Sequence, residues 1–379
     1  EENLLFTTSE YLDETPVTIS FSPGNYESET ALKSLIIPQN VVGFICSEGT
    51  AKLKNNFIIK NAPTLDIKNI DLVGDLEIIG DGTHKGKITW TNGKFYGKYN
   101  YVTKDQAIQS FIMEGVDQLV GSKLDGLYAN KILVTGKGVA TLQKVNCVLE
   151  SKFKEKIDVS ETGKLNRYME KCTVTSGGET MDLSGNGVMD DYLHQSRIYH
   201  IETDNGSQKD YWIINMVENS QIYQETKNTT HQGEFSDGSF WYNIHGQNNT
   251  LFDRVSDSNT HKISGLGGML SLSGKDQCQI KVRKQNGVIE ASTNKRLTPL
   301  YVKNLSDSCS LDQKVFNTKI TTASHYYETI QNGESELKEN INRVDYKIAG
   351  EYCTNNDQSK RYRNENYTFV TCDPEIGFH

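Results

Sequence analysis

Lys171-Cys-Thr-Val174 is followed by two similar tetrapeptides, Gln195-Ser-Arg-Ile198 and Asn219-Ser-Gln-Ile222. In each of them a small residue is followed two places later by an aliphatic one. The same pattern occurs upstream at Asn146-Cys-Val-Leu149 and downstream at Gln277-Cys-Gln-Ile280. The small residues stand at positions 147, 172, 196, 220 and 278, so the successive steps are 25, 24, 24 and 58, and the last equals two steps of 29. This regular spacing predicts a structural repeat.

A spacing in the mid-twenties matches one turn of a parallel β-helix. Three short strands and three turns need about that many residues at about 3.3 Å per strand residue, and coils stack at about 4.8 Å so that equivalent residues form ladders. Ile70-Asp-Leu72 and Gly93-Lys-Phe95 extend the pattern toward the N-terminus. Short strands separated by Gly, Asn, Asp and Ser also suit a sandwich or a barrel. Because of the repeat, we predict an all-β, right-handed parallel β-helix with coils of about 24 residues.

The N-terminal segment carries a second signal. A strand beginning at Val17 runs into Pro23-Gly-Asn-Tyr26, and a further strand ends at Ile37-Pro38 before a third runs into Gly43. Pro and Gly favour a tight turn there, and the Tyr ring is suited to covering the open end of a core. This order resembles the entry coil of the pectin-lyase-like superfamily of right-handed parallel β-helices. The resemblance spans about residues 17–285 and implies the architecture, without implying one activity within the superfamily.

The chain is expected to divide where the repeat fades, after about Val288. We predict a parallel β-helix with its entry coil in residues 1–287, and a C-terminal cap or small appended β-rich region in residues 288–379. A solenoid needs such a cover because the open edge of its last coil otherwise invites aggregation.

The seven cysteines include no Cys-x-x-Cys pair, which argues against a thiolate zinc site, and we predict no metal site. Cys353 and Cys372 are candidates for a disulfide in the C-terminal region. Stacking of coils brings Cys147 and Cys172 within disulfide reach, although the simplest role for both is as small residues of an inward ladder. An odd count leaves at least one thiol unpaired within the monomer.

Charge and hydropathy limit the classes of partner. The net charge is -9, so the chain lacks the basic stripe of a general nucleic-acid binder, and no apolar run approaches a membrane span. We therefore expect no nucleic-acid partner and no membrane insertion. The chain starts at Glu1 without Met, which fits removal of a signal peptide or a trimmed sequence. We expect a secreted or cell-surface protein, and the sequence leaves its oligomeric state open.

Asp190-Asp191 and the later His245-Gly246 are the candidates for catalysis. Glycoside hydrolases need paired carboxylates, and this set resembles part of the polygalacturonase motif. The departures are substantial: Asp191 and His245 are separated by about two coils where that family has one, and the family's Asn-Thr-Asp and Arg-Ile-Lys motifs are missing. The alternative is a solvated turn that carries an Asp pair.

Two other activities of the superfamily lack their motifs. Gly24-Asn-Tyr-Glu-Ser28 has Ser where pectinesterases have Glu, and the Arg-x-Pro-x-x-Arg motif of pectate lyases is absent. A uronate lyase needs a base and a cation, so Ca²⁺ is the one cofactor that we consider, and no other is predicted.

The densest polar and aromatic stretch runs from Glu234 to His261. Aromatic faces stack on sugar rings, and nearby Asp, Arg and His side chains can hydrogen-bond hydroxyl groups. Alternatively, the aromatic side chains pack back on the solenoid. The candidates for ligand binding, including a pair one coil earlier, are Tyr211, Trp212, Asp237, Trp241, Tyr242, Arg254 and His261.

Two functions follow from these observations. The first is a secreted or surface β-helix protein, such as an adhesin, that binds glycan or a host or cell surface without catalysis. The alternative is a polysaccharide-active enzyme, a uronate polymer lyase or a glycoside hydrolase, with a groove on one parallel sheet. The enzyme predicts an outer sheet face with at least two acidic residues and a Lys, Arg or Ca²⁺ site, whereas the adhesin predicts outer faces of Asn, Ser and Thr. Because each catalytic motif departs from its family, the sequence favours the first.

Overall fold

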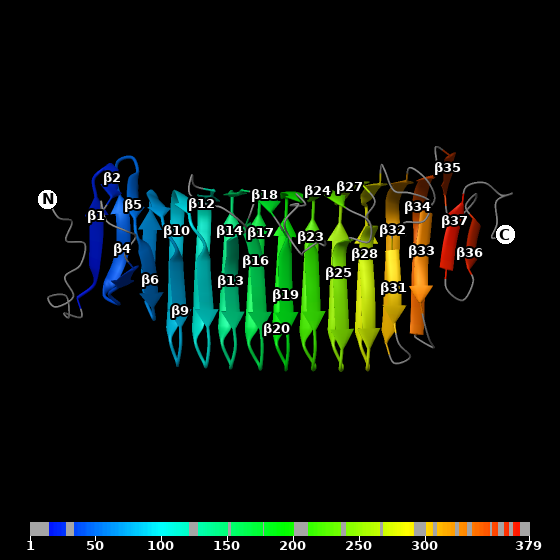
Figure 1. Cartoon of the computed structure of the whole chain (residues 1–379), viewed down its shortest axis with the longest axis horizontal. Helices are drawn as coiled ribbons and strands as arrows, with labels where there is room; N and C mark the ends of the chain where they lie inside the picture. Colours follow the sequence, from blue (N-terminus) through cyan, green and yellow to red (C-terminus); the bar gives the residue numbers. More distant parts are fainter. Residues whose placement is uncertain are drawn as a thin grey trace. The chain divides into compact units, whose positions relative to one another are not determined.

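The computed structural model describes fifteen segments of the chain: 15–27, 34–120, 128–150, 153–176, 178–200, 211–235, 240–265, 268–291, 301–305, 309–322, 326–331, 336–348, 351–354, 360–363 and 367–371. All regular secondary structure in these segments is β-strand (Figure 1). The chain forms two compact units, unit 1 (Glu1–Ser176) and unit 2 (Gly177–His379). Each unit is a parallel β-solenoid, which confirms the predicted parallel β-helix architecture.

Unit 1 has two parallel sheets. One sheet takes two short strands or one long strand from each coil, with a bend between its two halves, and we call it the bent sheet. The other takes one strand from each coil, and we call it the straight sheet. The strands of the bent sheet are β1 (Val17–Phe21), β2 (Gly24–Glu27), β4 (Val41–Cys46), β5 (Ala51–Lys54), β7 (Thr64–Lys68), β8 (Ile70–Val73), β10 (Lys85–Tyr96), β12 (Ile108–Gln118), β14 (Val139–Val145), β15 (Val148–Leu149), β17 (Lys164–Glu170) and β18 (Thr173–Ser176). Those of the straight sheet are β3 (Ser34–Ile37), β6 (Asn56–Lys60), β9 (Leu76–Gly80), β11 (Tyr99–Thr103), β13 (Tyr128–Val134) and β16 (Phe153–Val159).

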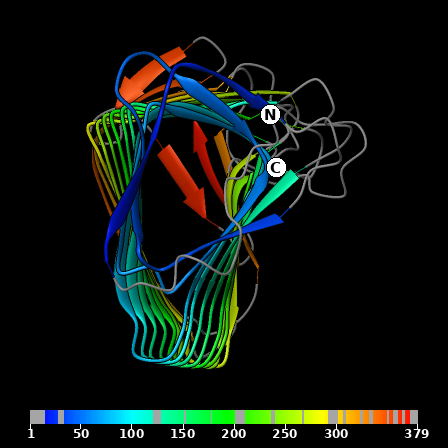
Figure 2. The same ribbon diagram turned by 90° about the vertical axis from the view of Figure 1, so that its left-hand side faces the viewer.

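Unit 2 continues with the same two kinds of sheet. Its bent sheet contains β20 (Val188–His194), β21 (Arg197–His200), β23 (Gln221–Lys227), β24 (Thr230–Phe235), β26 (Leu251–Asp257), β27 (Thr260–Gly265), β29 (Gln279–Gln285), β30 (Val288–Ala291), β32 (Ser310–Thr322), β34 (Glu336–Ile348) and β35 (Glu351–Thr354). Its straight sheet contains β19 (Glu179–Leu183), β22 (Trp212–Met216), β25 (Phe240–Gln247), β28 (Gly268–Lys275), β31 (Tyr301–Leu305), β33 (Tyr326–Gln331), β36 (Lys360–Arg363) and β37 (Tyr367–Thr371). Figure 2 is a view along the axis on which the coils stack. Within each unit, equivalent strands of successive coils overlie one another in this view.

Parallel pairing in unit 2 continues beyond Val288, through β32 and β34. The last three strands, β35, β36 and β37, pair antiparallel instead. Within the described residues, the parallel repeat ends at these strands. The division of the chain at residues 287 and 288 stays a prediction.

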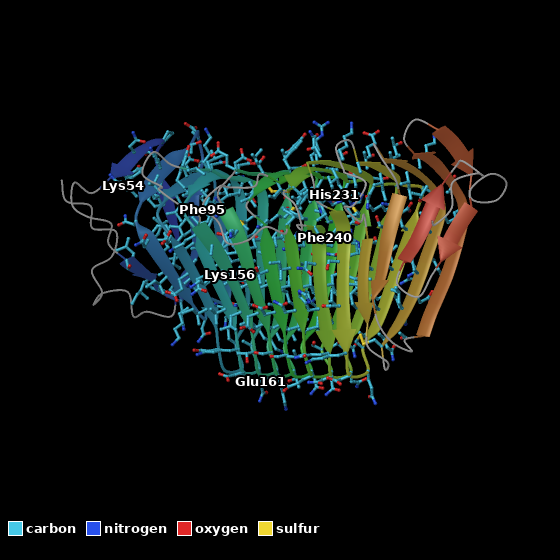
Figure 3. All side chains as sticks on the ribbon, turned by 45° about the vertical axis from the view of Figure 1, so that its right-hand side comes forward. Lys54, Phe95, Lys156, Glu161, His231 and Phe240 are labelled. Atoms are coloured by element: carbon cyan, nitrogen blue, oxygen red, sulfur yellow. A yellow bond between two sulfur atoms is a disulfide. The ribbon has the colours of Figure 1, made fainter. Side chains whose placement is uncertain are left out.

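Residues in the left-handed region of φ and ψ turn the chain at two places in most of the described coils. A tight turn after most of the straight-sheet strands contains one, such as Glu161 with φ of 57°, which lies at the lower edge of the coils in Figure 3. The bend within the bent sheet contains another, most often Asn, as at Asn69 and Asn92. Asn adopts this conformation more readily than other side chains because its short polar group bonds locally. Asn69 uses the same amide to donate to the Cys46 carbonyl oxygen at 2.8 Å, one coil back.

The number of residues in a coil is not constant at the predicted 24. Asn69 and Asn92 stack at the bend of adjacent coils with a sequence separation of 23, whereas the register partners Asp191 and Gln224 have a separation of 33. The variation arises between the short strand of the bent sheet and the next straight-sheet strand. Two residues connect β10 to β11, but eleven separate β21 from β22. Insertions there leave both sheets in register, because the connection lies outside the ladders.

The predicted ladder of small residues is wrong in its second half. Thr230 N donates to the Ser196 carbonyl oxygen, so Ser196 is stacked with Thr229 at the bend of the bent sheet. Leu251 N donates instead to the Ser220 carbonyl oxygen, which places Ser220 at the tight turn, in the row that leads to Cys278. The two serines therefore lie at different corners of the coil. The tetrapeptide pattern therefore marks a sharp corner of the coil. It does not show which corner, so residues that share the pattern need not stack in one row.

Disulfides cross-link neighbouring coils in both units. Cys147 and Cys172 are bonded in unit 1, and Cys278 and Cys309 are bonded in unit 2. The first is the pair that coil stacking predicts, and the second was not predicted. Among the described residues Cys46 is a free, buried thiol. Cys372 lies outside the described residues, so its pairing with Cys353 stays a prediction.

The core of unit 1 is mostly apolar, but among the described residues it also contains buried polar side chains, such as Gln109 and Asn130, and a buried cluster of charges. Glu155 accepts hydrogen bonds from Lys144, Tyr99 and Arg167, the last at 2.8 Å. Burial acts to raise the pKa of Glu155, but the charges of Lys144 and Arg167 outweigh it and lower the pKa to about 2. Glu155 is therefore a carboxylate at neutral pH, and both of its oxygens accept hydrogen bonds. Within the described residues, no helix has the length and apolar character of a membrane span.

Candidate functional site

The outer surface of the bent sheet in unit 2 carries a group of interacting polar and aromatic side chains. Alternate residues of β20, β23, β26 and β29 point away from the core, because side chains alternate along a strand. Parallel register places them in rows that cross the coils. The group, which we call the tyrosine–carboxylate face, consists of Asp190, Tyr192, His194, Tyr223, Glu225, Asp253 and Arg283.

Glu225 is the centre of the hydrogen bonding on the tyrosine–carboxylate face. Its Oε1 lies 2.9 Å from His194 Nε2, and its Oε2 accepts a 3.0 Å hydrogen bond from the Tyr223 hydroxyl. His194 belongs to the preceding coil, whereas Tyr223 precedes Glu225 by two residues on the same strand. Both carboxylate oxygens thus have protein partners, and the carboxylate fixes an imidazole and a phenol beside each other.

Tyr192 adds a second aromatic ring. Its ring centroid is 5.9 Å from that of Tyr223 and 6.2 Å from that of His194, which it meets at 85°. The three rings form one contiguous aromatic area on two adjacent coils. Partial burial, reinforced by the hydrogen bond to Glu225, raises the pKa of Tyr223 to about 12. Its hydroxyl therefore stays protonated at neutral pH and is a hydrogen-bond donor.

Acidic residues flank Tyr223 along one row. Asp190 and Asp253 are its register partners on either side, so their Cα atoms are about 10 Å apart, two coil spacings. Asp253 accepts a 2.5 Å hydrogen bond from Arg283 of the next coil. The face therefore carries two carboxylates, one on each side of Tyr223, with a guanidinium group beside one of them.

The three predicted catalytic residues do not form one site. Asp190 lies on the tyrosine–carboxylate face, but Asp191 is only 2% exposed and accepts a 2.9 Å hydrogen bond from Gln224 in the core. Consecutive strand residues point to opposite faces, so an adjacent Asp pair on a strand cannot act on one substrate. His245 is exposed on the straight sheet, where its Nδ1 contacts Ser273 Oγ of the next coil. It lies on a different wall of unit 2 from Asp190.

The predicted aromatic platform is wrong because its side chains are inside the solenoid. The rings of Trp212 and Tyr242 stack on adjacent coils with centroids 4.9 Å apart, and Tyr211 and Trp241 do so at 5.0 Å. Six of the predicted ligand-binding residues are at most 4% exposed: Tyr211, Trp212, Trp241, Tyr242, Arg254 and His261. The alternative, packing on the solenoid, is the observed one. Asp237 lies outside the described residues.

Sequence reasoning missed most of the tyrosine–carboxylate face. Its members alternate with apolar or buried residues, as in Val188-Met-Asp-Asp-Tyr-Leu-His194 and Gln221-Ile-Tyr-Gln-Glu-Thr-Lys227. Within one strand, this alternation identifies the residues whose side chains point outward. Finding the face also requires the register between coils, which a repeat of uneven length conceals.

The described part of the chain contains no cluster of three or more His, Cys, Asp or Glu side chains suited to a metal ion.

Comparisons with protein-family models, curated proteins and solved structures found no match. The fold and the tyrosine–carboxylate face therefore carry the functional argument.

Proposed function

We propose that this chain is a secreted or surface β-solenoid of the pectin-lyase-like kind, and that it binds a glycan along the tyrosine–carboxylate face of unit 2. The observation that carries the proposal is the outward pair Tyr192 and Tyr223, held beside the Glu225 carboxylate. Tyr rings present an apolar face with a polar edge, which suits the alternating CH and OH surfaces of a sugar.

The polar groups around the two rings supply the hydrogen bonds that a glycan needs. Glu225 and Asp253 are acceptors, whereas Arg283 and the Tyr223 hydroxyl are donors. These groups already bond one another, so their positions are fixed before a ligand arrives. Such preorganisation reduces the ordering cost of binding.

The regular coil spacing favours an extended polymer over a compact ligand. Rows of side chains repeat at about 4.8 Å across the coils, so a chain lying across the strands meets similar groups repeatedly. Secretion is supported by the two disulfides between coils, because such bonds persist in oxidising compartments.

The second candidate function is hydrolysis of the bound glycan. The favouring observation is the position of Asp190 and Asp253 on either side of Tyr223. An inverting mechanism needs a general acid and a general base on opposite sides of the bound glycosidic bond, and these two residues are the candidates for those roles. The ion pair with Arg283 fixes the position of the Asp253 carboxylate beside Tyr223.

A glycan array followed by a product assay tests both candidates. The chain is expected to retain an oligosaccharide, and the variant Tyr223→Ala is expected to lose about tenfold in affinity. Tyr168→Ala is the matched control, because Tyr168 is an exposed tyrosine on the bent sheet of unit 1. Equal binding by the wild type and Tyr223→Ala would reject the site.

Turnover of the retained polymer, lost in Asp190→Asn and in Asp253→Asn but kept in Asp312→Asn, would establish the hydrolase. Asp312 is the control because it lies in the same outward row, two coils beyond Asp253. Binding without turnover would establish a binding protein.

A further inference from the structure

The interior of unit 2 contains a group of buried nitrogen-bearing side chains that glycan binding does not use. Arg254 is 4% exposed, Lys284 is 7% exposed, and His231 and His261 are fully buried. We call these four residues the interior basic cluster. They come from β24, β26, β27 and β29, which belong to three successive coils.

The two histidines are stacked face to face. Their ring centroids are 4.2 Å apart with the planes 2° from parallel, as register partners on neighbouring coils. His261 Nε2 lies 3.3 Å from the Tyr242 hydroxyl, which in turn accepts a hydrogen bond from Arg254. The Arg254 guanidinium carbon also lies 3.4 Å from the Tyr242 ring centroid. Arg254 is therefore oriented within the core by an aromatic ring.

Lys284 lies one coil beyond Arg254 and two residues further along the strand direction. Ser256 is its register partner, so the Cβ atoms of Arg254 and Lys284 are about 8 Å apart. Both side chains are long enough to reach a common point inside the solenoid. A Cβ atom at Gly287 would lie 2.9 Å from Lys284 Cε. Glycine at that position thus leaves the space that the buried lysine occupies.

Several buried polar atoms in this region have no hydrogen-bond partner among the described residues, and they include both ring nitrogens of His231 and Nδ1 of His261. Lys284 Nζ and Trp212 Nε1 are both buried and make no hydrogen bond there. Both atoms are donors only. The Arg254 guanidinium carbon lies 5.8 Å from the Trp212 ring, so the indole borders the interior basic cluster. A buried ammonium group without a counter-charge is strongly unfavourable.

The acidic groups near the cluster do not reach Lys284. Asp191 is two coils before Arg254 in the same row, and it accepts its hydrogen bond from Gln224, which lies between them. Burial, followed by the charge of Arg254, lowers the pKa of Lys284 to about 7. Burial and the charges of Arg254 and Lys284 also hold the pKa of His231 well below its usual value. A negative partner would reverse the direction of these effects.

We propose that the interior of unit 2 binds one small inorganic anion of halide type, held by Lys284 Nζ, the Arg254 guanidinium and the Trp212 indole N–H. A halide ion accepts hydrogen bonds from several donors at once and has no groups of its own to satisfy. It is also small enough to lie between packed side chains. The ion would compensate the buried ammonium group and tie three successive coils together, since Trp212, Arg254 and Lys284 lie on β22, β26 and β29.

Thermal unfolding in matched sodium salts tests this site. Wild-type protein is expected to melt higher in bromide or chloride than in fluoride at equal ionic strength. General salt effects give the opposite order, because strongly hydrated ions stabilise proteins by exclusion from the surface. The gain is expected to be roughly 4 °C for each tenfold rise in bromide above half-saturation. A higher melting temperature in fluoride than in bromide would overturn the proposal.

Two variants locate the effect. Lys284→Met removes the buried ammonium group and is expected to abolish the bromide-specific gain. Lys281→Met is the matched control, because it removes an outward-facing lysine of the same strand, and it is expected to keep the gain. Loss of the gain in Lys281→Met, or its persistence in Lys284→Met, would contradict the assignment.

Crystals of the wild type grown in sodium bromide provide a measurement that does not depend on the folding of a variant. The proposal predicts an anomalous bromine peak within contact distance of Lys284 Nζ. Absence of that peak, or bromine peaks confined to the outer surface, would overturn the proposal.

Discussion

Glu225 Oε1 lies 2.9 Å from His194 Nε2, so a carboxylate on one coil holds an imidazole on the coil before it. The other oxygen of Glu225 accepts a hydrogen bond from Tyr223. These bonds fix the tyrosine–carboxylate face from within a rigid sheet and do not depend on a loop. Glu225→Gln keeps the shape of the side chain but removes its charge, and we expect it to weaken glycan binding by about tenfold, because charged hydrogen bonds are stronger than neutral ones. Calorimetric titration with the glycan selected by the array provides the measurement, with Glu290→Gln on β30 as the control. An unchanged affinity in Glu225→Gln would show that this carboxylate does not support the site.

The three tryptophans of the chain, Trp90, Trp212 and Trp241, are each at most 1% exposed. We therefore predict blue-shifted indole emission that acrylamide quenches poorly in the native protein and well after unfolding. Addition of glycan is expected to leave this emission unchanged, since the sugar binds to outward tyrosines. Strong quenching in the native state, or a shift of the emission on adding glycan, would instead support the exposed aromatic platform that the sequence predicts.

The buried Glu155 makes the stability of unit 1 sensitive to acid. Its pKa is lowered from 4.5 to about 2 in the folded state, so its contribution is complete above pH 4.5 and is lost as the pH falls toward 2. Glu155→Gln leaves Lys144 and Arg167 buried without a carboxylate and is expected to cost about 3–5 kcal/mol at pH 7. Urea unfolding between pH 2 and pH 7 checks both effects, with the exposed Glu114→Gln as control. The same loss in both variants would mean that the buried charges do not stabilise unit 1.

The disulfide between Cys147 and Cys172 joins residues 25 positions apart on stacked coils. Replacing both with Ala is expected to cost about 3 kcal/mol of unfolding free energy, because the bond restricts the unfolded chain. Denaturant midpoints of the double variant and the wild type, each with and without reductant, measure this cost. Reductant should still lower the midpoint of the double variant through the Cys278–Cys309 bond. A wild type insensitive to reductant would contradict both bonds.

The sequence predicts the solenoid because its corners are chemically distinctive. Lys171, Gln195 and Asn219, which open the three similar tetrapeptides, all have φ between 49° and 58°. A left-handed residue followed by a small one is the local requirement of a sharp corner, and it is visible without an alignment. The same geometry occurs at two corners of most of the described coils, however. The pattern therefore reveals the architecture but not the register.

The candidate site was not predictable in the same way. Trp241 and Tyr242 are adjacent and both buried, which breaks the alternation expected of an exposed strand. Clustering of aromatic residues in the sequence thus indicates the core of a wide coil, where large rings stack between the sheets. The outward residues Tyr192 and Glu225 are distant in the sequence, yet they are register partners on adjacent coils. Only the length of the intervening connection, which no local pattern encodes, determines that pairing.

The most direct measurement is a crystal structure of the chain with the oligosaccharide that the array selects. We expect sugar rings over Tyr192 and Tyr223, with hydroxyl groups within hydrogen-bond distance of Glu225 and Arg283. An oligosaccharide bound to the straight sheet beside His245, or to unit 1, would contradict the proposed site.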